Sequence, residues 1–357
     1  MTGLWPLARP FLFRIDPERA HRLALQALAC GLVPRAPTPD PRLRRTLLGL
    51  DFPNPIGMAA GMDKHAEVPD ALLGLGFGFV EVGTVTPRSQ PGNPTPRLFR
   101  LPEHEALVNR FGFNSEGQDA VHARLAARRR RRGIVGVNVG ANKDSSDRID
   151  DYARGVARFA DVADYIAINI SSPNTPGLRG LHEASDLARL LRTVVTARDG
   201  AARRVPLLVK ISPDLDDEAL VAVVRIARET GIEGLIVANT TVSRTEVAGH
   251  RHAGEAGGLS GRPLFLRSTA MLARARALAG PDMVLVGAGG VDSPETAFAK
   301  VLAGADLVQL YTGLIFRGPT LPGSIIASLP RLLAERGFAT LAEAVGADPE
   351  AYRMLAA

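Results

Sequence analysis

Eight short apolar runs, spread along most of the chain, constrain its fold more than any other feature of the sequence. Each run is rich in aliphatic or β-branched residues and ends in a polar or glycine-rich turn, which is typical of a strand buried on both faces. The runs lie at residues 56–60, 79–83, 134–139, 165–170, 206–211, 234–238, 283–287 and 306–310. Helical patterns separate them, for example at 185–197, 216–230, 267–279 and 293–303. This alternation predicts an α/β fold, a parallel (β/α)8 TIM barrel.

A doubly wound open sheet is the alternative to the barrel. That fold would place a glycine-rich dinucleotide fingerprint directly after the first strand. Residues 59–64 follow the first predicted strand and contain one glycine, so they do not form that fingerprint. We therefore prefer the barrel.

The N-terminal segment does not follow the alternating pattern and is predicted to be a helical extension. An apolar stripe runs through residues 4–12, and a second helix is predicted from Pro17 to about Leu32. Both are shorter than the roughly 20 apolar residues that cross a bilayer, but an amphipathic pair can lie in the membrane interface. Packing against the barrel as an ordinary helical hairpin is the alternative. We place the extension at residues 1–38 and the barrel domain at 39–357.

Composition limits the kinds of site that the chain can build. Cys30 is the one cysteine and the seven histidines are scattered, so neither a disulfide framework nor a metal site is expected. The net charge of +6 permits contact with nucleic acid or an anionic membrane. The densest basic run, Arg128 to Arg132, has no aromatic residues within it. We interpret it as a solvated helix end and predict no nucleic-acid partner.

Polar residues collect at the ends of the predicted strands, which is where TIM barrels place their chemistry. The candidates are Lys64, Thr84, Asn138, Asn169, Ser172, Lys210, Asn239, Gly289, Gly290, Tyr311 and Thr312. Lysine is rare in this arginine-rich chain, and three of its four lysines closely follow strands. A compact ammonium makes a point-charge contact that a guanidinium cannot reproduce in a tight site. Chance placement of a few residues is the alternative.

Three glycine turns near the last strands predict a phosphate site. Residues 286–293 end the seventh strand and open a helix, so their backbone amides can point at an anion. Residues 311–313 and the glycine turn at 259–263 can complete the cradle. Each turn alone is explained by tight backbone geometry, but together they indicate a phosphorylated cofactor or substrate.

Five motifs resemble those of the dihydroorotate dehydrogenase family, and the likeness extends from about Leu7 to Gly346. They lie at residues 59–64, 109–114, 169–178, 259–264 and 289–293. Ser172 stands at the position of the catalytic base, where the soluble first class has cysteine. The chain is thus similar to the second, quinone-dependent class, as is its N-terminal extension, which resembles the membrane-associating segment of that class.

The resemblance implies an activity and its cofactors. The expected reaction is oxidation of (S)-dihydroorotate to orotate in de novo pyrimidine biosynthesis, with Ser172 as the base, hydride transfer to one FMN per subunit, and electron transfer to a membrane quinone. It also implies a peripheral protein on the cytoplasmic face of the bacterial inner membrane, with no obligatory protein partner.

The resemblance also implies site residues. Those expected at the substrate are Lys64, Asn109, Arg110, Phe111, Gly112, Phe113, Asn169, Asn174, Asn239 and Thr240. Those expected at FMN are Ala60, Gly61, Met62, Asp63, Lys64, Thr84, Asn138, Asn169, Lys210, Ala238, Gly261, Gly290, Tyr311 and Thr312. Those expected near the quinone are His21, Arg100 and Tyr311. The alternatives are a different FMN barrel oxidoreductase and a basic membrane-binding or nucleic-acid-binding protein.

Overall fold

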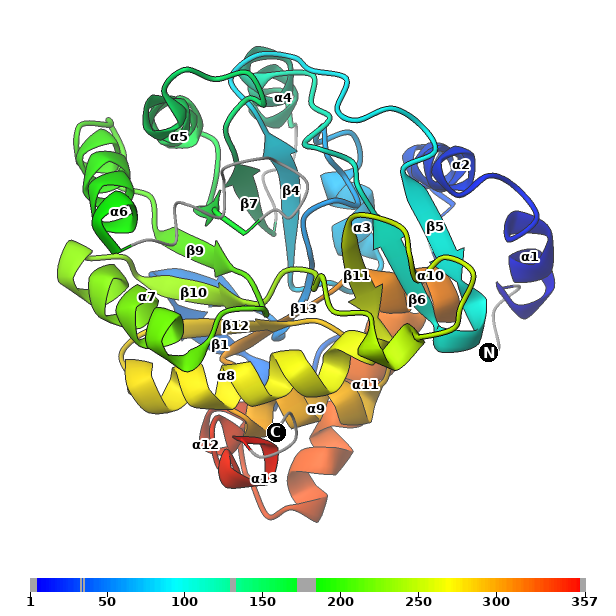
Figure 1. The fold of residues 1–357 in the computed structure, drawn as a ribbon. Coiled ribbons are helices and arrows are strands. Elements are labelled where there is room, and N and C mark those ends of the chain that lie inside the picture. The colour runs from blue at the N-terminus through cyan, green and yellow to red at the C-terminus, as the bar shows by residue number, and fades with distance from the viewer. Residues whose placement is uncertain (1–4, 33, 35, 129–132, 172–183, 354–357) are drawn as a thin grey trace.

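The computed structural model describes residues 5–32, 34, 36–128, 133–171 and 184–353. Within these residues, eight parallel strands close into a barrel in chain order, which confirms the predicted (β/α)8 architecture (Figure 1). The barrel strands are β3 (Ile56–Met58), β4 (Phe79–Val85), β7 (Ile134–Val139), β8 (Tyr165–Asn169), β9 (Leu207–Ile211), β10 (Gly234–Val237), β12 (Val284–Ala288) and β13 (Leu307–Leu310). The open-sheet alternative is wrong, because β13 pairs with β3 and leaves no free edge.

Helices surround the barrel and bury the outer faces of its strands. They are α3 (Pro69–Gly74), α4 (Gln118–Ala126), α5 (Arg148–Phe159), α6 (Ala184–Asp199), α7 (Asp217–Thr230), α8 (Phe265–Ala279), α9 (Pro294–Leu302) and α11 (Leu321–Glu335). Shorter helices α10 (Thr312–Arg317), α12 (Leu341–Ala344) and α13 (Glu350–Arg353) complete the C-terminal part. Local caps set several helix starts. The Asp216 carboxylate, for example, accepts the backbone N–H of Ala219 at 2.8 Å at the start of α7.

Aromatic rings fill the lower part of the barrel. Phe79 and Tyr165 point inward, and a Cβ atom at Gly57 or Gly136 would lie within 2.2 Å of one of these rings. Glycine on the neighbouring strand therefore gives each ring its space. The hairpin of β1 (Arg45–Leu47) and β2 (Leu50–Phe52) closes this end, and the ring of Phe52 meets that of Phe79 edge to face at 5.4 Å. Ligands can thus enter from the carboxyl ends of the strands.

A second sheet lies above the carboxyl ends of the barrel strands. It consists of β5 (Leu98–Leu101), β6 (Ala106–Asn109) and β11 (Gly258–Gly261), with β6 in the middle. The prediction of a glycine turn at 259–263 was therefore partly wrong. Residues up to Gly261 pair with β6 as a strand, and the chain turns at Gly261, whose φ is 98°.

The N-terminal extension forms two helices, α1 (Trp5–Leu12) and α2 (Pro17–Ala29), beside β5 and β6 (Figure 1). The Trp5 indole donates a hydrogen bond to the Phe316 carbonyl at 3.2 Å, and Glu18 forms an ion pair with Arg97 at 2.6 Å. None of the described helices is long and apolar enough to cross a membrane. The helical nature of the extension is confirmed, whereas the division of domains at residue 38 stays a prediction.

Candidate active site

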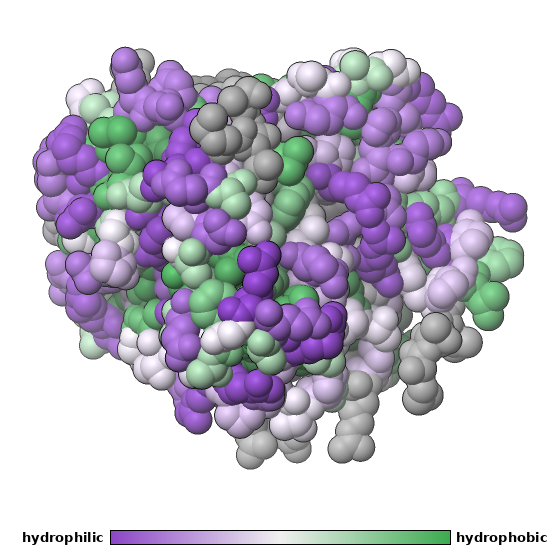
Figure 2. All heavy atoms as spheres, turned by 90° about the horizontal axis from the view of Figure 1, so that it is seen from below, coloured by the Kyte–Doolittle hydropathy of each residue, from purple (hydrophilic) through white to green (hydrophobic). Residues whose placement is uncertain are grey.

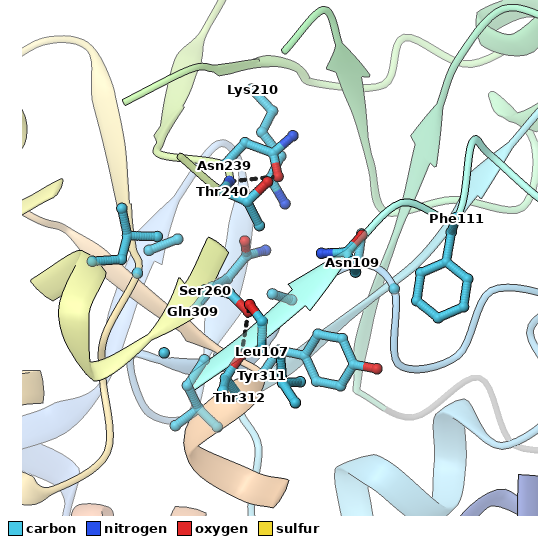
Figure 3. Close-up of a pocket in the computed structure, with 18 of the residues that line it drawn as sticks. Leu107, Asn109, Phe111, Lys210, Asn239, Thr240, Ser260, Gln309, Tyr311 and Thr312 are labelled. Atoms are coloured by element: carbon cyan, nitrogen blue, oxygen red, sulfur yellow. Dashed lines mark hydrogen bonds between the residues drawn. The ribbon is translucent and has the colours of Figure 1, made fainter. Parts of the chain in front are cut away.

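A polar pocket opens at the carboxyl ends of the barrel strands, beneath the second sheet (Figure 3). Most of the predicted site residues line it. From the substrate and FMN sets these are Ala60, Gly61, Lys64, Thr84, Asn109, Phe111, Gly112, Phe113, Asn169, Lys210, Ala238, Asn239, Thr240, Gly261, Gly290, Tyr311 and Thr312. Sequence positions from 60 to 312 are thus brought to one cavity.

Four predicted residues do not line the pocket. The Arg110 guanidinium pairs with Glu255 at 2.6 Å and stacks over the Phe99 ring, so it faces away from the pocket. The Asp63 carboxylate accepts the backbone N–H groups of Glu67 and Val68. These contacts hold the side chains of Arg110 and Asp63 in the local fold.

The other two residues lie next to the pocket. Asn138 is buried behind Thr84, whose hydroxyl donates to its amide oxygen at 2.6 Å. Met62 lines a different, apolar cavity. Ser172 and Asn174 lie outside the described residues, as does the part of the basic run at 129–132.

The floor of the pocket is a buried polar network centred on Glu81. The Glu81 carboxyl group accepts hydrogen bonds from the Asn138 amide at 2.8 Å, the Tyr165 hydroxyl at 3.0 Å and the Gln309 amide at 2.8 Å. These donors come from three other barrel strands. Sequence reasoning missed this network and the pocket residues Gln309 and Ser260, although a lone carboxylate or amide in an apolar strand is a usable signal.

Lys210 reaches into the pocket above this floor. It is buried on β9 beside Asn169 of β8, and no described residue hydrogen-bonds its ammonium. Burial lowers the pKa of Lys210, and the charge of Glu81 acts in the opposite direction. The ammonium therefore feels the charge of Glu81, and within the described part of the chain its N–H donors remain available to a ligand.

Lys64 lies on the opposite side of the pocket, with its Nζ 3.3 Å from the centroid of the Phe111 ring. Burial and the neighbouring Arg97 lower the pKa of Lys64 to about 7, while Glu18 raises it. A cation at this position favours an anionic ligand.

Amides and hydroxyls line the wall between the two lysines. The Asn239 amide donates to the Ser171 hydroxyl at 2.9 Å, and that hydroxyl donates to the Asn169 amide oxygen at 3.1 Å. The Asn169 amide donates in turn to the Thr84 hydroxyl at 3.1 Å. Such groups offer donors and acceptors without charge, which suits a ring bearing amides and carbonyls.

Gly289 and Gly290, which belong to the predicted phosphate cradle, follow β12 and line the pocket. Their φ angles are 107° and 73°, and a Cβ atom at Gly290 would lie 2.4 Å from the Cβ atom of Phe265. Ser293 caps α9 directly afterwards in a capping box with Thr296. Glycine is required for this close approach of backbone segments, and the start of α9 favours an anion nearby.

An apolar cavity adjoins the pocket, between the α1–α2 hairpin and the barrel. His21, Arg100 and Tyr311 line it, and Tyr311 lines both cavities. The Tyr311 hydroxyl lies 3.5 Å from Nδ1 of His21. Burial is the main cause that lowers the pKa of His21 to about 4, so the ring is neutral near pH 7. The two cavities therefore meet at Tyr311 and at Leu98 and Leu107 of the second sheet, which also line both.

We expect replacement of Glu81 by leucine to lower the free energy of unfolding by about 3–5 kcal/mol, because three buried donors lose their acceptor and Lys210 loses a favourable charge at nearly constant side-chain volume. Urea unfolding measures this change. Glu67→Leu is the matched control at an exposed carboxylate and should shift the free energy by less than about 0.5 kcal/mol. Equal stability of the two variants would contradict the role given to the network.

Comparisons with known proteins agree with this arrangement. The family model described as dihydroorotate dehydrogenase matches residues 42–333. The chain is 57% identical over 332 residues to the dihydroorotate dehydrogenase (quinone) of Mesorhizobium japonicum, covering 93% of this chain and 92% of that protein. It is 53% identical over 348 residues to the protein of the same name in Brucella ovis, covering 96% of each.

Among solved structures, the DHODH of Eimeria tenella in complex with ferulenol superposes with a TM-score of 0.89. That protein is 38% identical to this chain, and the match covers 93% of this chain and 95% of the other. The ligand-free form of the same protein gives the same TM-score and covers 99% of that chain. Both comparisons extend over the barrel and beyond.

Proposed function

The chain belongs to the dihydroorotate dehydrogenase family, and from this premise we propose that it oxidises (S)-dihydroorotate to orotate in de novo pyrimidine biosynthesis. The proposed electron path leads through FMN to a membrane quinone. The observation that carries the proposal is the meeting of a polar and an apolar cavity at Leu98, Leu107 and Tyr311. A polar substrate and an apolar oxidant can then reach one cofactor through different cavities.

The polar pocket fits FMN. The glycine cradle and the start of α9 suit its phosphate, and Gly261 and Thr312 close the cradle, where the Thr312 hydroxyl donates to the Ser260 hydroxyl at 2.9 Å. Lys210 supplies a buried cation for the N1–O2 edge of the ring system. When bound, FMN accepts a hydride and passes electrons on to an acceptor.

The remaining polar residues suit dihydroorotate. Lys64 can pair with the substrate carboxylate, while Asn109, Asn169 and Asn239 can hydrogen-bond its ring. Ser172, proposed as the base, removes a proton from the carbon next to a carbonyl as hydride leaves the adjacent carbon. Asn174 is proposed to join the substrate contacts. Both residues follow Ser171, which lies in the amide network.

The apolar cavity suits the quinone, with its head near His21, Arg100 and Tyr311. Arg100 donates to the carbonyls of Phe13 and Ile15, which ties this site to the chain between α1 and α2. A neutral His21 is compatible with an uncharged quinone.

The outer face of the α1–α2 hairpin suits a membrane surface. Leu7 is 71% and Phe11 67% exposed on α1. In Figure 2, hydrophobic side chains stand out at the right-hand edge, where this hairpin lies. Exposed apolar groups beside arginines are typical of an interfacial helix. We propose peripheral association with the cytoplasmic face of a bacterial inner membrane.

An anaerobic visible spectrum before and after addition of dihydroorotate tests the proposal. We expect the absorbance of oxidised flavin, and its loss on addition of the substrate. A flavin spectrum that persists would favour a different FMN barrel oxidoreductase. Folded protein that binds no flavin, with salt-sensitive affinity for nucleic acid, would overturn the proposed function.

The pKa of Lys64 predicts how ligand binding depends on pH. Lys64 is protonated below about pH 7 and neutral above it, so the affinity for anionic orotate should fall as pH rises above about 7, approaching about ten-fold per pH unit. Titration of flavin absorbance with orotate measures this. Lys64→Met should bind weakly with no such step, and a flat affinity between about pH 6 and 9 in the unaltered protein would contradict the assignment.

A further inference from the structure

A buried lysine lies behind the glycine cradle and takes part in none of the steps above. Lys300 on α9 has a relative exposure of 0%. Its Nζ donates a hydrogen bond to the Ser268 hydroxyl on α8 at 2.7 Å and lies 5.2 Å from the centroid of the Phe265 ring. No carboxylate among the described residues pairs with it. Burying a charged amine without a counter-ion costs free energy, so a buried lysine at this position needs a functional or structural explanation.

Both contacts of this amine are also contacts of the cradle. The Ser268 hydroxyl lies 3.2 Å from the Gly289 carbonyl oxygen, and a Cβ atom at Gly289 would lie 2.7 Å from the same hydroxyl. Gly290 rests against Phe265, where its Cβ would lie 2.4 Å from the Phe265 Cβ. Lys300 is therefore separated from each cradle glycine by one side chain.

The single Ser268 hydroxyl proton is shared among the carbonyl oxygens of Leu264 at 2.8 Å, Phe265 at 3.2 Å and Gly289 at 3.2 Å, so its contact with Gly289 helps to orient the peptide between the two glycines. In a trans peptide the carbonyl and the following N–H point in opposite directions. With the Gly289 carbonyl turned to Ser268, the Gly290 N–H lies on the opposite side of that peptide, and Gly290 itself lines the pocket. A cation that donates to Ser268 strengthens this chain of hydrogen bonds.

We propose that Lys300 is a positioning residue of the phosphate site, which acts through Ser268 on the Gly289–Gly290 peptide and makes the cradle selective for a ligand carrying a phosphate dianion. The proposal rests on the proposed function in that FMN is taken as this ligand. The charge of Lys300 acts through a poorly screened interior. Burial lowers the pKa of Lys300 well below its usual range, and a phosphate dianion nearby favours its protonated form.

Rebinding of FMN and of riboflavin tests the proposal, because riboflavin has the same ring system and no phosphate. Flavin is removed from the full-length protein by dialysis, and each ligand is titrated by fluorescence quenching. We expect Lys300→Met to weaken FMN binding about ten-fold or more and riboflavin binding less than about two-fold. Lys143→Met, the same change at an exposed lysine, should leave both affinities unchanged.

A purely structural role of Lys300 predicts a different result. If Lys300→Met weakens both ligands equally, or neither, the proposal is overturned. Ser268→Ala is the second variant, in case Lys300→Met does not fold. It should also lower the ratio of the FMN affinity to the riboflavin affinity. Unaltered protein that binds neither flavin would refute the proposed function itself, whereas phosphate selectivity retained in both variants refutes this proposal alone.

Discussion

Replacement of Lys210 by methionine is expected to slow flavin reduction by dihydroorotate about 10²–10³-fold per bound flavin. Lys210 is buried beside Asn169, and no described residue hydrogen-bonds its ammonium, so its donors are available to a ligand in the pocket. Negative charge on the ligand edge that faces Lys210 grows as hydride is transferred. Methionine has a similar length but no charge, so it removes this stabilisation with little change in packing.

Stopped-flow spectroscopy under anaerobic conditions measures this rate, and the bound flavin is quantified for each sample. That normalisation separates a loss of catalysis from a loss of cofactor. The flavin reduction potential should also fall in Lys210→Met, because a nearby cation favours the reduced form. Lys143→Met again serves as the control. A rate per flavin within about three-fold of the unaltered protein would rule out the role given to Lys210.

Removal of residues 1–38 is expected to abolish quinone reduction and membrane association while dihydroorotate still bleaches the flavin. The deletion removes α1 and α2, which form one wall of the apolar cavity. The polar pocket is lined by residues from Ala59 onward, so the reductive half-reaction keeps its site. The two half-reactions should therefore separate. Full-rate quinone reduction by the truncated protein would contradict the proposed quinone site in the apolar cavity.

A double variant separates the proposed membrane-binding surface from the apolar cavity proposed to hold the quinone. Leu7→Ser with Phe11→Ser changes two exposed side chains of α1 that do not line the apolar cavity. Each should lose up to about 1.5–3 kcal/mol of apolar contact with lipid. Sedimentation with phospholipid vesicles should fall by about ten-fold or more, whereas reduction of a short-chain, water-soluble quinone should continue. Loss of both vesicle binding and quinone reduction would mean that these two side chains of α1 also shape the apolar cavity.

Local signals explain why much of the fold could be predicted. Each barrel strand is a continuous apolar run because it is buried on both faces, and each such run is visible without knowledge of its partners. The caps at Asp216 and Ser293 act within one helical turn, so they too are local. The motifs of the site are also short segments at strand ends, which is why most candidate residues line one pocket.

Pairings between distant segments could not be predicted in the same way. The strand β11 pairs with β6, about 150 residues earlier in the chain, and alone it looked like a glycine turn. Arg110 belongs to a predicted motif, yet Glu255 and Phe99 hold its side chain away from the pocket. The sequence around β11 does not reveal β6 as its partner, and the sequence around Arg110 does not reveal Glu255 or Phe99.

The sequence by itself determined the barrel, the helical extension and the chemical character of the strand ends, because these depend on local periodicity and residue type. Only the tertiary structure decided which side chains share a cavity and which are buried away from it. Glu81 acquires its partners from β7, β8 and β13, and Lys300 reaches the cradle through a residue of another helix. Such contacts depend on how separate elements pack, since burial makes each polar group take the partners that packing brings within reach.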